Sequence, residues 1–428
     1  MIALDSSTRL FKIATLGCRT NQYESQAYRD QLIKMGWSEA DDNQPADLCI
    51  VNTCTVTESA DISSRQQIKQ LAKKNPEAKI YVTGCAAEKN PQSLKTLPQV
   101  EEVVPNLKKE SLIPMIFQDQ DVPEFKIERF EAHTRAFIKV QDGCNSYCSY
   151  CIIPFVRGRS RSKKMEEIIL EAQGLIRNGY QEIVLTGINI GDFDGGVADG
   201  EVQPRLADLV TAIDQLPGLQ RLRVSSIDPD EVDDRLLKAI VEGKNTCHSM
   251  HIVLQSGSNT VLKRMNRKYT KQQFYDAINR LKEQHADFTF TTDVIVGFPG
   301  ETDAEFEETL HAIRQVRFAK VHMFPYSLRP GTRAARLPNP VSQQVIAERK
   351  DQVLRLAEQV AFELREGYVG QVMPVLLESK DRLSDAYTGH TDNFLEVIVS
   401  GRNLLENTIY PVRMVSNSAK GLIGEVVV

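Results

Sequence analysis

The chain has 428 residues, with 52 Lys or Arg against 57 Asp or Glu, so its formal net charge is −5. At roughly 150 residues per domain, this length predicts two to four domains with extended cores and excludes a small disulfide-stabilised scaffold. Hydrophobic residues make up 41% of the chain and charged residues 25%, which is typical of globular proteins and excludes wholesale disorder. Because the net charge is negative, any nucleic-acid site must be a local basic patch.

The sequence shows no export or membrane signal. The first residues, MIALDSSTRL, contain no basic segment followed by an apolar run, and no stretch of about 18 apolar residues appears anywhere. We therefore expect a cytoplasmic protein with no membrane partner. In that compartment the eight cysteines are expected to be metal ligands or catalytic thiols rather than members of disulfides.

The first hundred residues alternate apolar runs with helical stretches. The runs FKIATLG, DLCIVNT and KIYVTG lie between residues 11 and 104 and predict a parallel α/β sheet. A cysteine follows or closes each run. Since the carboxyl ends of parallel strands meet at one edge of a sheet, we expect these three cysteines to lie close together in space. They are Cys18, Cys54 and Cys85.

A second series of strand and helix patterns follows an irregular stretch, residues 105–133, which we interpret as a linker. Helical patterns such as MEEIILEAQGLIRN separate six apolar runs. Six such units predict a partial (β/α)6 barrel with its chemistry at the carboxyl ends of the strands. The expected strands are 136–140, 182–187, 221–227, 250–255, 290–297 and 320–327.

The last part of the chain changes character. A helix is expected from about residue 341 to 366, and after Gly367 short β-rich runs separated by turns predict a small all-β barrel or sandwich. The predicted fold class is therefore α/β with three domains. They are an N-terminal parallel α/β domain (1–125), a central partial barrel with its trailing helix (126–365) and a small all-β domain (366–428).

The strongest motif is QDGCNSYCSYC, directly after the first barrel strand. Its Cys144, Cys148 and Cys151 form a C-x3-C-x2-C array. Three thiolates on one loop can hold three irons of a cubane cluster and leave the fourth iron open to a ligand. A structural zinc ion is the alternative, but zinc usually takes four ligands, and no fourth Cys or His stands at a suitable spacing.

This loop resembles the motif of the radical S-adenosylmethionine enzymes, C-x3-C-x-aromatic-C, with Tyr150 as the aromatic residue. The resemblance implies that the amino and carboxylate groups of S-adenosylmethionine bind the open iron of a 4Fe-4S cluster. It also implies that VIVGFPGET (294–302) lines the adenine site, where Gly and Pro fix a tight turn and leave room. Polar groups at two other strand ends are further candidates, although a turn role is the alternative for each. The candidate S-adenosylmethionine contacts are Tyr150, Ser226, Gln255, Gly297 and Pro299.

With TLGCRTNQYES, VNTCTVT and TGCAAE added, the chain from Phe11 onward resembles the radical S-adenosylmethionine tRNA methylthiotransferases. The resemblance implies that Cys18, Cys54 and Cys85 hold a second 4Fe-4S cluster, again with an open iron. It also places Asn21 and Asn52 against that cluster or the substrate, with turn capping as the alternative. The C-terminal domain resembles TRAM, a small RNA-binding barrel. For the two remaining cysteines, Cys49 and Cys247, packing is the better interpretation.

Within this family the sequence is most similar to the branch that acts on N6-threonylcarbamoyladenosine at position 37 of tRNA, next to the anticodon. The implied reaction adds a methylthio group to C2 of the base and consumes two S-adenosylmethionine molecules per turnover. It requires a one-electron reductant of the flavodoxin or ferredoxin type, a sulfur donor and a base that leaves its stack. Three alternatives stay open: isopentenyladenosine-37 as the substrate, ribosomal protein S12 as the substrate, and a non-catalytic RNA-binding protein with structural metal.

Binding tRNA requires positive charge near the site. The runs FVRGRSRSKK and LKRMNRKY flank the expected barrel opening, and Arg329 follows the last barrel strand. They suit a phosphate-bearing partner, although a solvated charged face is the alternative. From Gly367 onward, five Lys or Arg against seven Asp or Glu give −2, so the RNA-binding role of that domain stays open. The candidate tRNA contacts are Arg157, Arg159, Arg161, Arg267 and Arg329, together with Asn21 and Asn52.

Overall fold

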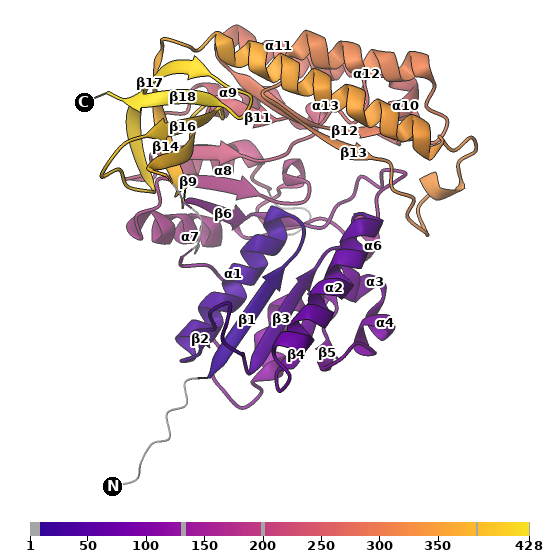
Figure 1. Cartoon of the computed structure of the whole chain (residues 1–428), viewed down its shortest axis with the longest axis vertical. Coiled ribbons are helices and arrows are strands. Elements are labelled where there is room, and N and C mark those ends of the chain that lie inside the picture. Colours follow the sequence, from indigo (N-terminus) through magenta and orange to yellow (C-terminus); the bar gives the residue numbers. More distant parts are fainter. Residues whose placement is uncertain (1–8, 130–133, 198–201, 382–383, 428) are drawn as a thin grey trace.

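The computed structural model describes residues 9–129, 134–197, 202–381 and 384–427. Figure 1 shows an N-terminal α/β domain lying against a central, incomplete barrel, and a small β-barrel packed on the far side of the central barrel. The predicted fold class is confirmed. No described helix is long and apolar enough to cross a bilayer.

The N-terminal domain is built on a parallel sheet with strand order β2-β1-β3-β4-β5. The central strand β3 is buried along its whole length because helices cover both faces. Cys49 and Val51 pack against α2 on one face, and Ile50 packs against α1 and α5 on the other. The elements are β1 (Leu10–Thr15), α1 (Arg19–Lys34), β2 (Ser38–Glu39), β3 (Leu48–Thr53), α2 (Glu58–Lys74), β4 (Lys79–Gly84), α3 (Cys85–Lys89), α4 (Pro91–Lys95), β5 (Val100–Val103), η1 (Asn106–Ser111) and α5 (Leu112–Ile116).

The stretch interpreted as an irregular linker begins as part of this domain. Residues 106–116 form η1 and α5, and Leu112 and Ile113 complete the core on one face of the sheet. That part of the linker prediction is wrong, because a short segment with few apolar residues gives no periodic signal even when those residues are buried.

The central domain has six parallel strands in two groups, β10-β9-β6 and β11-β12-β13. Parallel bridges from Leu222 to Thr246 and from Ile227 to Ile252 join the groups into one curved sheet. Each predicted strand is found, and the largest difference is at β11, which is three residues long. The elements are β6 (Arg135–Lys139), β7 (Gln141–Asp142), α6 (Ile153–Val156), β8 (Arg161–Ser162), α7 (Met165–Arg177), β9 (Glu182–Thr186), α8 (Leu206–Asp214), β10 (Arg221–Val224), α9 (Asp234–Val241), β11 (Ser249–His251), α10 (Asn259–Arg264), α11 (Lys271–Gln284), β12 (Thr289–Val296), α12 (Asp303–Val316), β13 (Lys320–Pro325) and α13 (Gln343–Glu366).

The chain itself marks where several of these helices begin. Thr270 before α11 and Thr302 before α12 each form a capping box with the residue three positions on, and Ser342 caps α13. Such caps satisfy backbone N–H groups that have no partner within the helix. These caps therefore fix the residues at which the helices begin. The loops between the strand ends and the helices remain available for functional residues.

The C-terminal domain is a closed five-stranded barrel in the order β14-β15-β16-β18-β17. It attaches to the amino ends of the central strands. Arg135, which begins β6, lies 3.1 Å from Glu378. Arg221, which begins β10, donates to the carbonyl oxygens of His390 and Pro374. The barrel therefore sits opposite the strand ends that carry the cysteine loop. Its strands are β14 (Val372–Lys380), β15 (Ala386–Thr391), β16 (Glu396–Ser400), β17 (Thr408–Asn417) and β18 (Leu422–Val426).

Candidate functional site

The loop of Cys144, Cys148 and Cys151 follows β6 and β7 at the carboxyl edge of the central sheet. Gly143 opens it with φ +74°, and a Cβ there would lie 2.0 Å from the carbonyl oxygen of Arg159. Only glycine fits this close approach. Ser149 fixes the far side of the loop, since its N–H and hydroxyl donate to the carbonyl oxygens of Met265 and Arg264, each at 2.8 Å.

The N-terminal cysteines come from three strand ends. Cys18 precedes α1, Cys54 follows β3 and Cys85 begins α3 directly after β4. Glycines with positive φ let these loops touch. A Cβ on Gly17 would lie 2.9 Å from Cys54 Sγ, and a Cβ on Gly84 would lie 2.4 Å from the carbonyl oxygen of Thr53. The structure thus brings the three loops together at one edge of the sheet, as expected.

Within each trio the thiols influence one another. Burial raises the pKa of Cys85 to about 12, and Cys18 and Cys54 add to the rise, while Arg157 opposes it. Burial, with Cys148 as a further contributor, raises the pKa of Cys151 to about 12. Without a metal these thiols therefore stay protonated at neutral pH, and a bound metal would supply the positive charge that favours thiolates.

The compactness of each cysteine trio can be compared with the arrangement that a single metal ion requires. In the described part of the chain, one trio of His, Cys, Asp or Glu side chains has all ligand atoms within 4.8 Å of one another, and it is His248, His285 and Asp287. Neither cysteine trio is that compact. Thiolates around one tetrahedral zinc ion lie about 3.8 Å apart. As placed, neither cysteine trio is therefore arranged around a single zinc ion.

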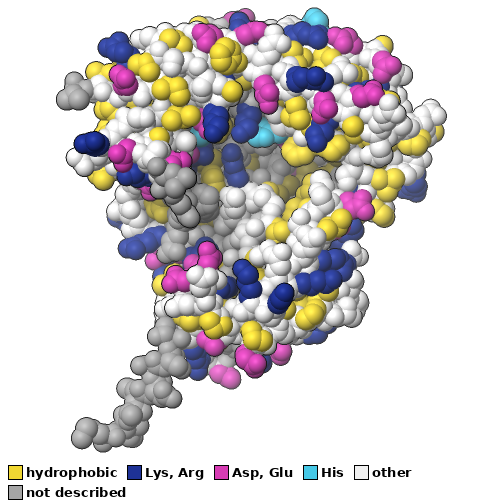
Figure 2. Space-filling view, in the orientation of Figure 1, with side chains coloured by type: hydrophobic (Ala, Val, Ile, Leu, Met, Phe, Trp, Pro, Cys, Tyr) yellow, Lys and Arg dark blue, Asp and Glu magenta, His cyan; other side chains and the backbone are white. Residues whose placement is uncertain are grey.

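A cavity of about 200 Å³ lies between the two trios. Tyr150 and Cys151, from the loop of Cys144, Cys148 and Cys151 (the radical loop), line it together with Val56 and Thr57, which follow Cys54. Its remaining walls come from strand ends of the central barrel. Figure 2 shows the hollow between the central barrel and the N-terminal domain, with Lys and Arg side chains near its rim. The remaining lining residues are Ile152, Ile153, Gln255, Asp293, Ile295, Phe324, Pro325, Tyr326 and Ser327.

Four of the five candidate S-adenosylmethionine contacts lie in or next to this cavity. Tyr150 packs edge-on against Phe298, at 6.3 Å between ring centroids, so the loop and the GFPG turn touch. Gln255 lines the cavity with a buried Oε1 that has no partner among the described residues. Gly297, at φ +75°, donates its N–H to Glu301 at 2.7 Å, and Pro299 is buried beside it. Ser226 is half-buried after β10, outside the cavity lining.

Asn21 and Asn52 are buried and connect the cysteine loops. The Asn21 amide donates to the carbonyl oxygens of Leu16 at 2.6 Å and Thr53 at 3.0 Å, and its oxygen lies 3.6 Å from Cys18 Sγ. Asn52 donates to the carbonyl oxygen of Asn21 at 3.1 Å. Neither amide reaches the surface, which disfavours the predicted tRNA contact, whereas contact with the predicted second cluster stays a prediction. The turn-forming interpretation fits both.

Arg157 also departs from its predicted role. Its side chain is 0% exposed and bonds Glu24 of α1 at 3.2 Å, Asp142 at 2.9 Å and the Asn21 oxygen. Lys109 joins the same network, 2.5 Å from Glu24. Burial alone would raise the pKa of Glu24, but Lys109 and Arg157 lower it to about 2. Arg157 therefore ties the N-terminal domain to the radical loop and is not available to a tRNA phosphate.

Two more arginines predicted to bind tRNA are used internally. Arg267, 6% exposed, donates to Cys148 Sγ at 3.0 Å and pairs with Asp228. Arg329, 3% exposed, bonds Thr55 at 2.7 Å and Asp61 at 2.6 Å in the N-terminal domain. Those predictions are wrong for the same reason as for Arg157. Long basic side chains beside a loop look like a surface patch in sequence, whatever they bond in the fold. Arg159 and Arg161 are exposed and stay candidates.

Sequence patterns missed the charged interior of the central barrel. Arg19 of α1 lies with its guanidinium 5.4 Å from the Phe137 ring on β6. Burial, together with Arg135 and Arg223, lowers its pKa to about 10, so it remains charged at neutral pH. His251 and Asp293 lie 3.4 Å apart nearby. The available signal was the position of Arg19 directly after Cys18.

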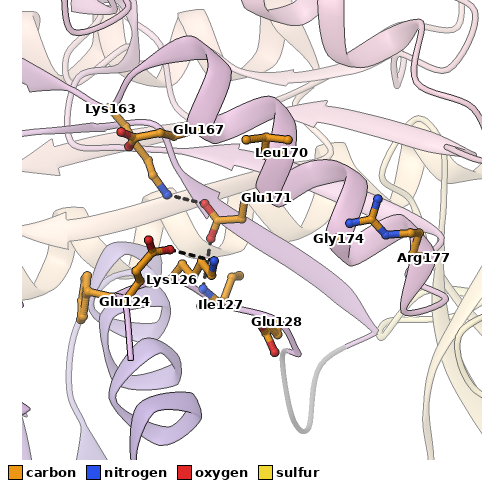
Figure 3. A pocket seen from close by; sticks show the side chains of 11 residues that line it. Glu124, Lys126, Ile127, Glu128, Lys163, Glu167, Leu170, Glu171, Gly174 and Arg177 are labelled. Carbon is orange, nitrogen blue, oxygen red and sulfur yellow. Dashed lines mark hydrogen bonds and ion pairs between the residues drawn. The ribbon is translucent and has the colours of Figure 1, made fainter. Parts of the chain in front are cut away.

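A second depression lies between α7 and the segment before β6 (Figure 3). Its charged side chains neutralise one another: Lys163 lies 2.5 Å from Glu171, and Lys126 lies 2.8 Å from Glu124. No cysteine and no carboxyl end of a central strand lines it, so it is separate from the site between the trios.

Comparisons with known proteins agree with this arrangement. Residues 138–313 match the family model "Radical SAM superfamily", and residues 10–105 match "Uncharacterized protein family UPF0004". Among solved structures, the radical S-adenosylmethionine methyltransferase TsrM from Kitasatospora setae has a TM-score of 0.53 at 13% identity, covering 76% of this chain and 74% of that chain. The likeness to TsrM shows a shared fold.

Relatives match along almost the full length. The chain is 48% identical to "Threonylcarbamoyladenosine tRNA methylthiotransferase MtaB" of Chlamydia pneumoniae, over 97% of this chain and 98% of the relative. The protein of the same name from Bacillus subtilis (strain 168) is 37% identical, over 94% and 92%. A "tRNA-2-methylthio-N(6)-dimethylallyladenosine synthase" of Caldicellulosiruptor saccharolyticus is 33% identical, over 99% and 93%. The chain belongs to the radical S-adenosylmethionine family of tRNA methylthiotransferases.

Proposed function

We propose that this protein adds a methylthio group to C2 of N6-threonylcarbamoyladenosine at position 37 of tRNA. The observation that carries the substrate assignment is the 48% identity to a threonylcarbamoyladenosine tRNA methylthiotransferase over 97% of the chain. The dimethylallyladenosine synthase compared above is 33% identical. The cavity between two cysteine trios supports the reaction class, because a methylthio transfer needs a radical-generating centre and a sulfur-carrying centre beside one substrate.

Cys144, Cys148 and Cys151 would hold the 4Fe-4S cluster of this family, which with S-adenosylmethionine supplies the radical that removes hydrogen from the base. Two side chains near this loop would support the cluster and its ligand. Arg267 donates a hydrogen bond to Cys148 Sγ, which stabilises negative charge on that sulfur. Gln255 offers an unpartnered amide oxygen in the cavity wall, an acceptor for a ligand N–H or O–H group.

Cys18, Cys54 and Cys85 would hold the second 4Fe-4S cluster and carry the sulfur that is transferred. Their loops reach the same cavity through Val56 and Thr57. Phe324 and Tyr326 also line this cavity and offer aromatic side chains on which an unstacked base can pack. Exposed Arg159 lies on the segment that follows the radical loop and suits the phosphates of a tRNA anticodon arm.

The proposal includes two further partners. A one-electron reductant of the flavodoxin or ferredoxin type would supply the radical loop, and a separate sulfur donor would replenish the second site after each transfer. We place the reaction in the cytoplasm, where tRNA and these donors are present together.

Nucleoside mass spectrometry of total tRNA tests the proposal. A strain lacking the gene should lose 2-methylthio-N6-threonylcarbamoyladenosine, and a plasmid copy should restore it, whereas a copy carrying Cys148→Ala should not. If the 2-methylthio-isopentenyl nucleoside disappears instead, the reaction stands and the substrate is wrong. If neither changes, the tRNA assignment is wrong, and methylthiolation of ribosomal protein S12 or a structural-metal role takes its place.

A further inference from the structure

Arg19 is a half-buried cation beside the central barrel and has no anionic partner among the described residues. It is the first residue of α1, and α1 packs against β6, so the side chain enters the barrel from the N-terminal domain. In the described part of the chain, its guanidinium has no hydrogen bond and no ion pair, and its contact is the face of Phe137. An unpaired guanidinium away from bulk water is costly unless a ligand pairs with it.

The other charges around it are already matched. Arg223 pairs with Glu182 at 2.8 Å, and Arg135 pairs with Glu378 at 3.1 Å. Asp293 has His251 at 3.4 Å. The described carboxylates near Arg19 each contact another side chain, and none of them forms an ion pair with its guanidinium.

The position of Arg19 along the barrel indicates where its partner comes from. Its charged neighbours include Arg135 and Glu182, which begin β6 and β9, and also Asp293 of β12, which lines the cavity. The candidate S-adenosylmethionine contacts Gln255 and Gly297 stand at the opposite, carboxyl end. Arg19 therefore has neighbours both at the cavity wall, through Asp293, and at the amino ends of β6 and β9.

We propose that Arg19 binds the carboxylate of the amino-acid substituent on the substrate adenosine and so selects a threonylcarbamoyl group over an apolar isopentenyl group. This inference rests on the proposed function. A guanidinium binds a carboxylate through two parallel N–H···O bonds, which an uncharged hydrocarbon substituent cannot form. Since Arg19 directly follows Cys18, the same helix start would align the substituent with the sulfur-carrying site.

The test uses two synthetic anticodon stem–loops that differ at one group. One carries N6-threonylcarbamoyladenosine with a free carboxylate, and the other carries its methyl ester. We expect the wild-type protein to bind the acid about tenfold more tightly than the ester. Arg19→Gln should bind both with equal affinity, and Arg19→Lys should keep part of the preference. Arg29→Gln, also on α1 but paired with Glu39 on the surface, should behave as wild type.

Three results would overturn the proposal. The wild-type protein could bind acid and ester with the same affinity. The Arg19→Gln variant could keep the preference for the acid, or it could bind both stem–loops more weakly by the same factor. The carboxylate of S-adenosylmethionine is the other group that Arg19 could bind, and equilibrium dialysis measures that affinity. If Arg19→Gln binds S-adenosylmethionine more weakly but still prefers the acid stem–loop to the ester, Arg19 binds the cofactor and not the substrate. The iron content of the Arg19→Gln variant shows whether the substitution also disturbs the loop of Cys18. Wild-type turnover on the acid stem–loop tests the proposed function separately, because binding preference and product formation are measured independently.

Discussion

Segments that belong to the loops of both cysteine trios line one cavity, but the two trios are built differently. The three cysteines of the radical loop lie within the short segment 144–151. The N-terminal trio gathers Cys18, Cys54 and Cys85 from three strand ends, and its geometry depends on Gly17, Gly84 and buried amides. A locally encoded site tolerates changes elsewhere in the fold, whereas an assembled site depends on every contact that aligns its loops. The predictions below test this difference.

Replacing Cys148 by Ser should have the largest effect, because it removes a ligand from the local site. We expect 5′-deoxyadenosine formation and methylthio transfer to fall below detection. Iron in the anaerobically purified protein should fall from about eight to about four per chain if each trio holds a four-iron cluster. Unchanged 5′-deoxyadenosine formation would refute this ligand assignment.

Gly84→Ala should selectively damage the assembled site. The new Cβ would lie 2.4 Å from the Thr53 carbonyl oxygen at a φ of +93°, so the loops of Cys54 and Cys85 must separate. We expect the loss of about half of the iron and of methylthio transfer, with 5′-deoxyadenosine formation retained. The matched control is Gly36→Ala, which has φ +83° and no atom within 4 Å of the added Cβ. It should cost about 1 kcal/mol of stability and no iron. Equal iron loss in both variants would contradict the role of loop contact.

Arg157→Met should weaken the contact between the N-terminal domain and the radical loop. It leaves Glu24 and Asp142 buried with one cation fewer, so we expect the free energy of unfolding to fall by about 3–5 kcal/mol. Chemical denaturation of the metal-free protein measures this. Arg29→Met, which breaks a more exposed pair with Glu39, should cost about 1 kcal/mol or less. Similar losses for both variants would contradict the importance of the buried network.

The same network predicts an acid-sensitive stability. The pKa of Glu24 is lowered to about 2 in the folded protein from an ordinary value of 4.5. Its contribution is therefore complete above about pH 4.5 and is lost as the pH falls towards 2. Glu24→Gln should reduce stability at pH 7 and flatten the pH dependence between those values, measured as unfolding midpoints. An unchanged slope would contradict the ionised state of Glu24.

The smallest effect is expected on the surface. Arg159→Ala should weaken tRNA binding a few-fold and reduce the slope of log affinity against log salt by about 1, because one phosphate contact is lost. Arg314→Ala, exposed on α12, is the control. If both variants bind tRNA equally well, the basic segment after the radical loop does not contact RNA.

Sequence alone predicted the fold class and the meeting of the Cys18, Cys54 and Cys85 loops at one sheet edge, because strand–helix alternation is a local signal. It assigned buried arginines to the surface, since nothing in FVRGRSRSKK shows that Arg157 meets Glu24 from a helix more than a hundred residues earlier. Arg19 was missed for a similar reason. Its surroundings consist of residues from β6, β9, β10 and β12, which only the closed fold brings together.

The most direct test of the two-trio account is the Cys54→Ala variant, assayed anaerobically with tRNA, reductant and S-adenosylmethionine. Formation of 5′-deoxyadenosine and of the methylthiolated nucleoside are measured in the same reaction. The account predicts that 5′-deoxyadenosine is still formed while the methylthiolated nucleoside is absent, because the radical loop is intact and the sulfur-carrying trio is not. Formation of the methylthiolated nucleoside by this variant would contradict the assignment of the N-terminal trio.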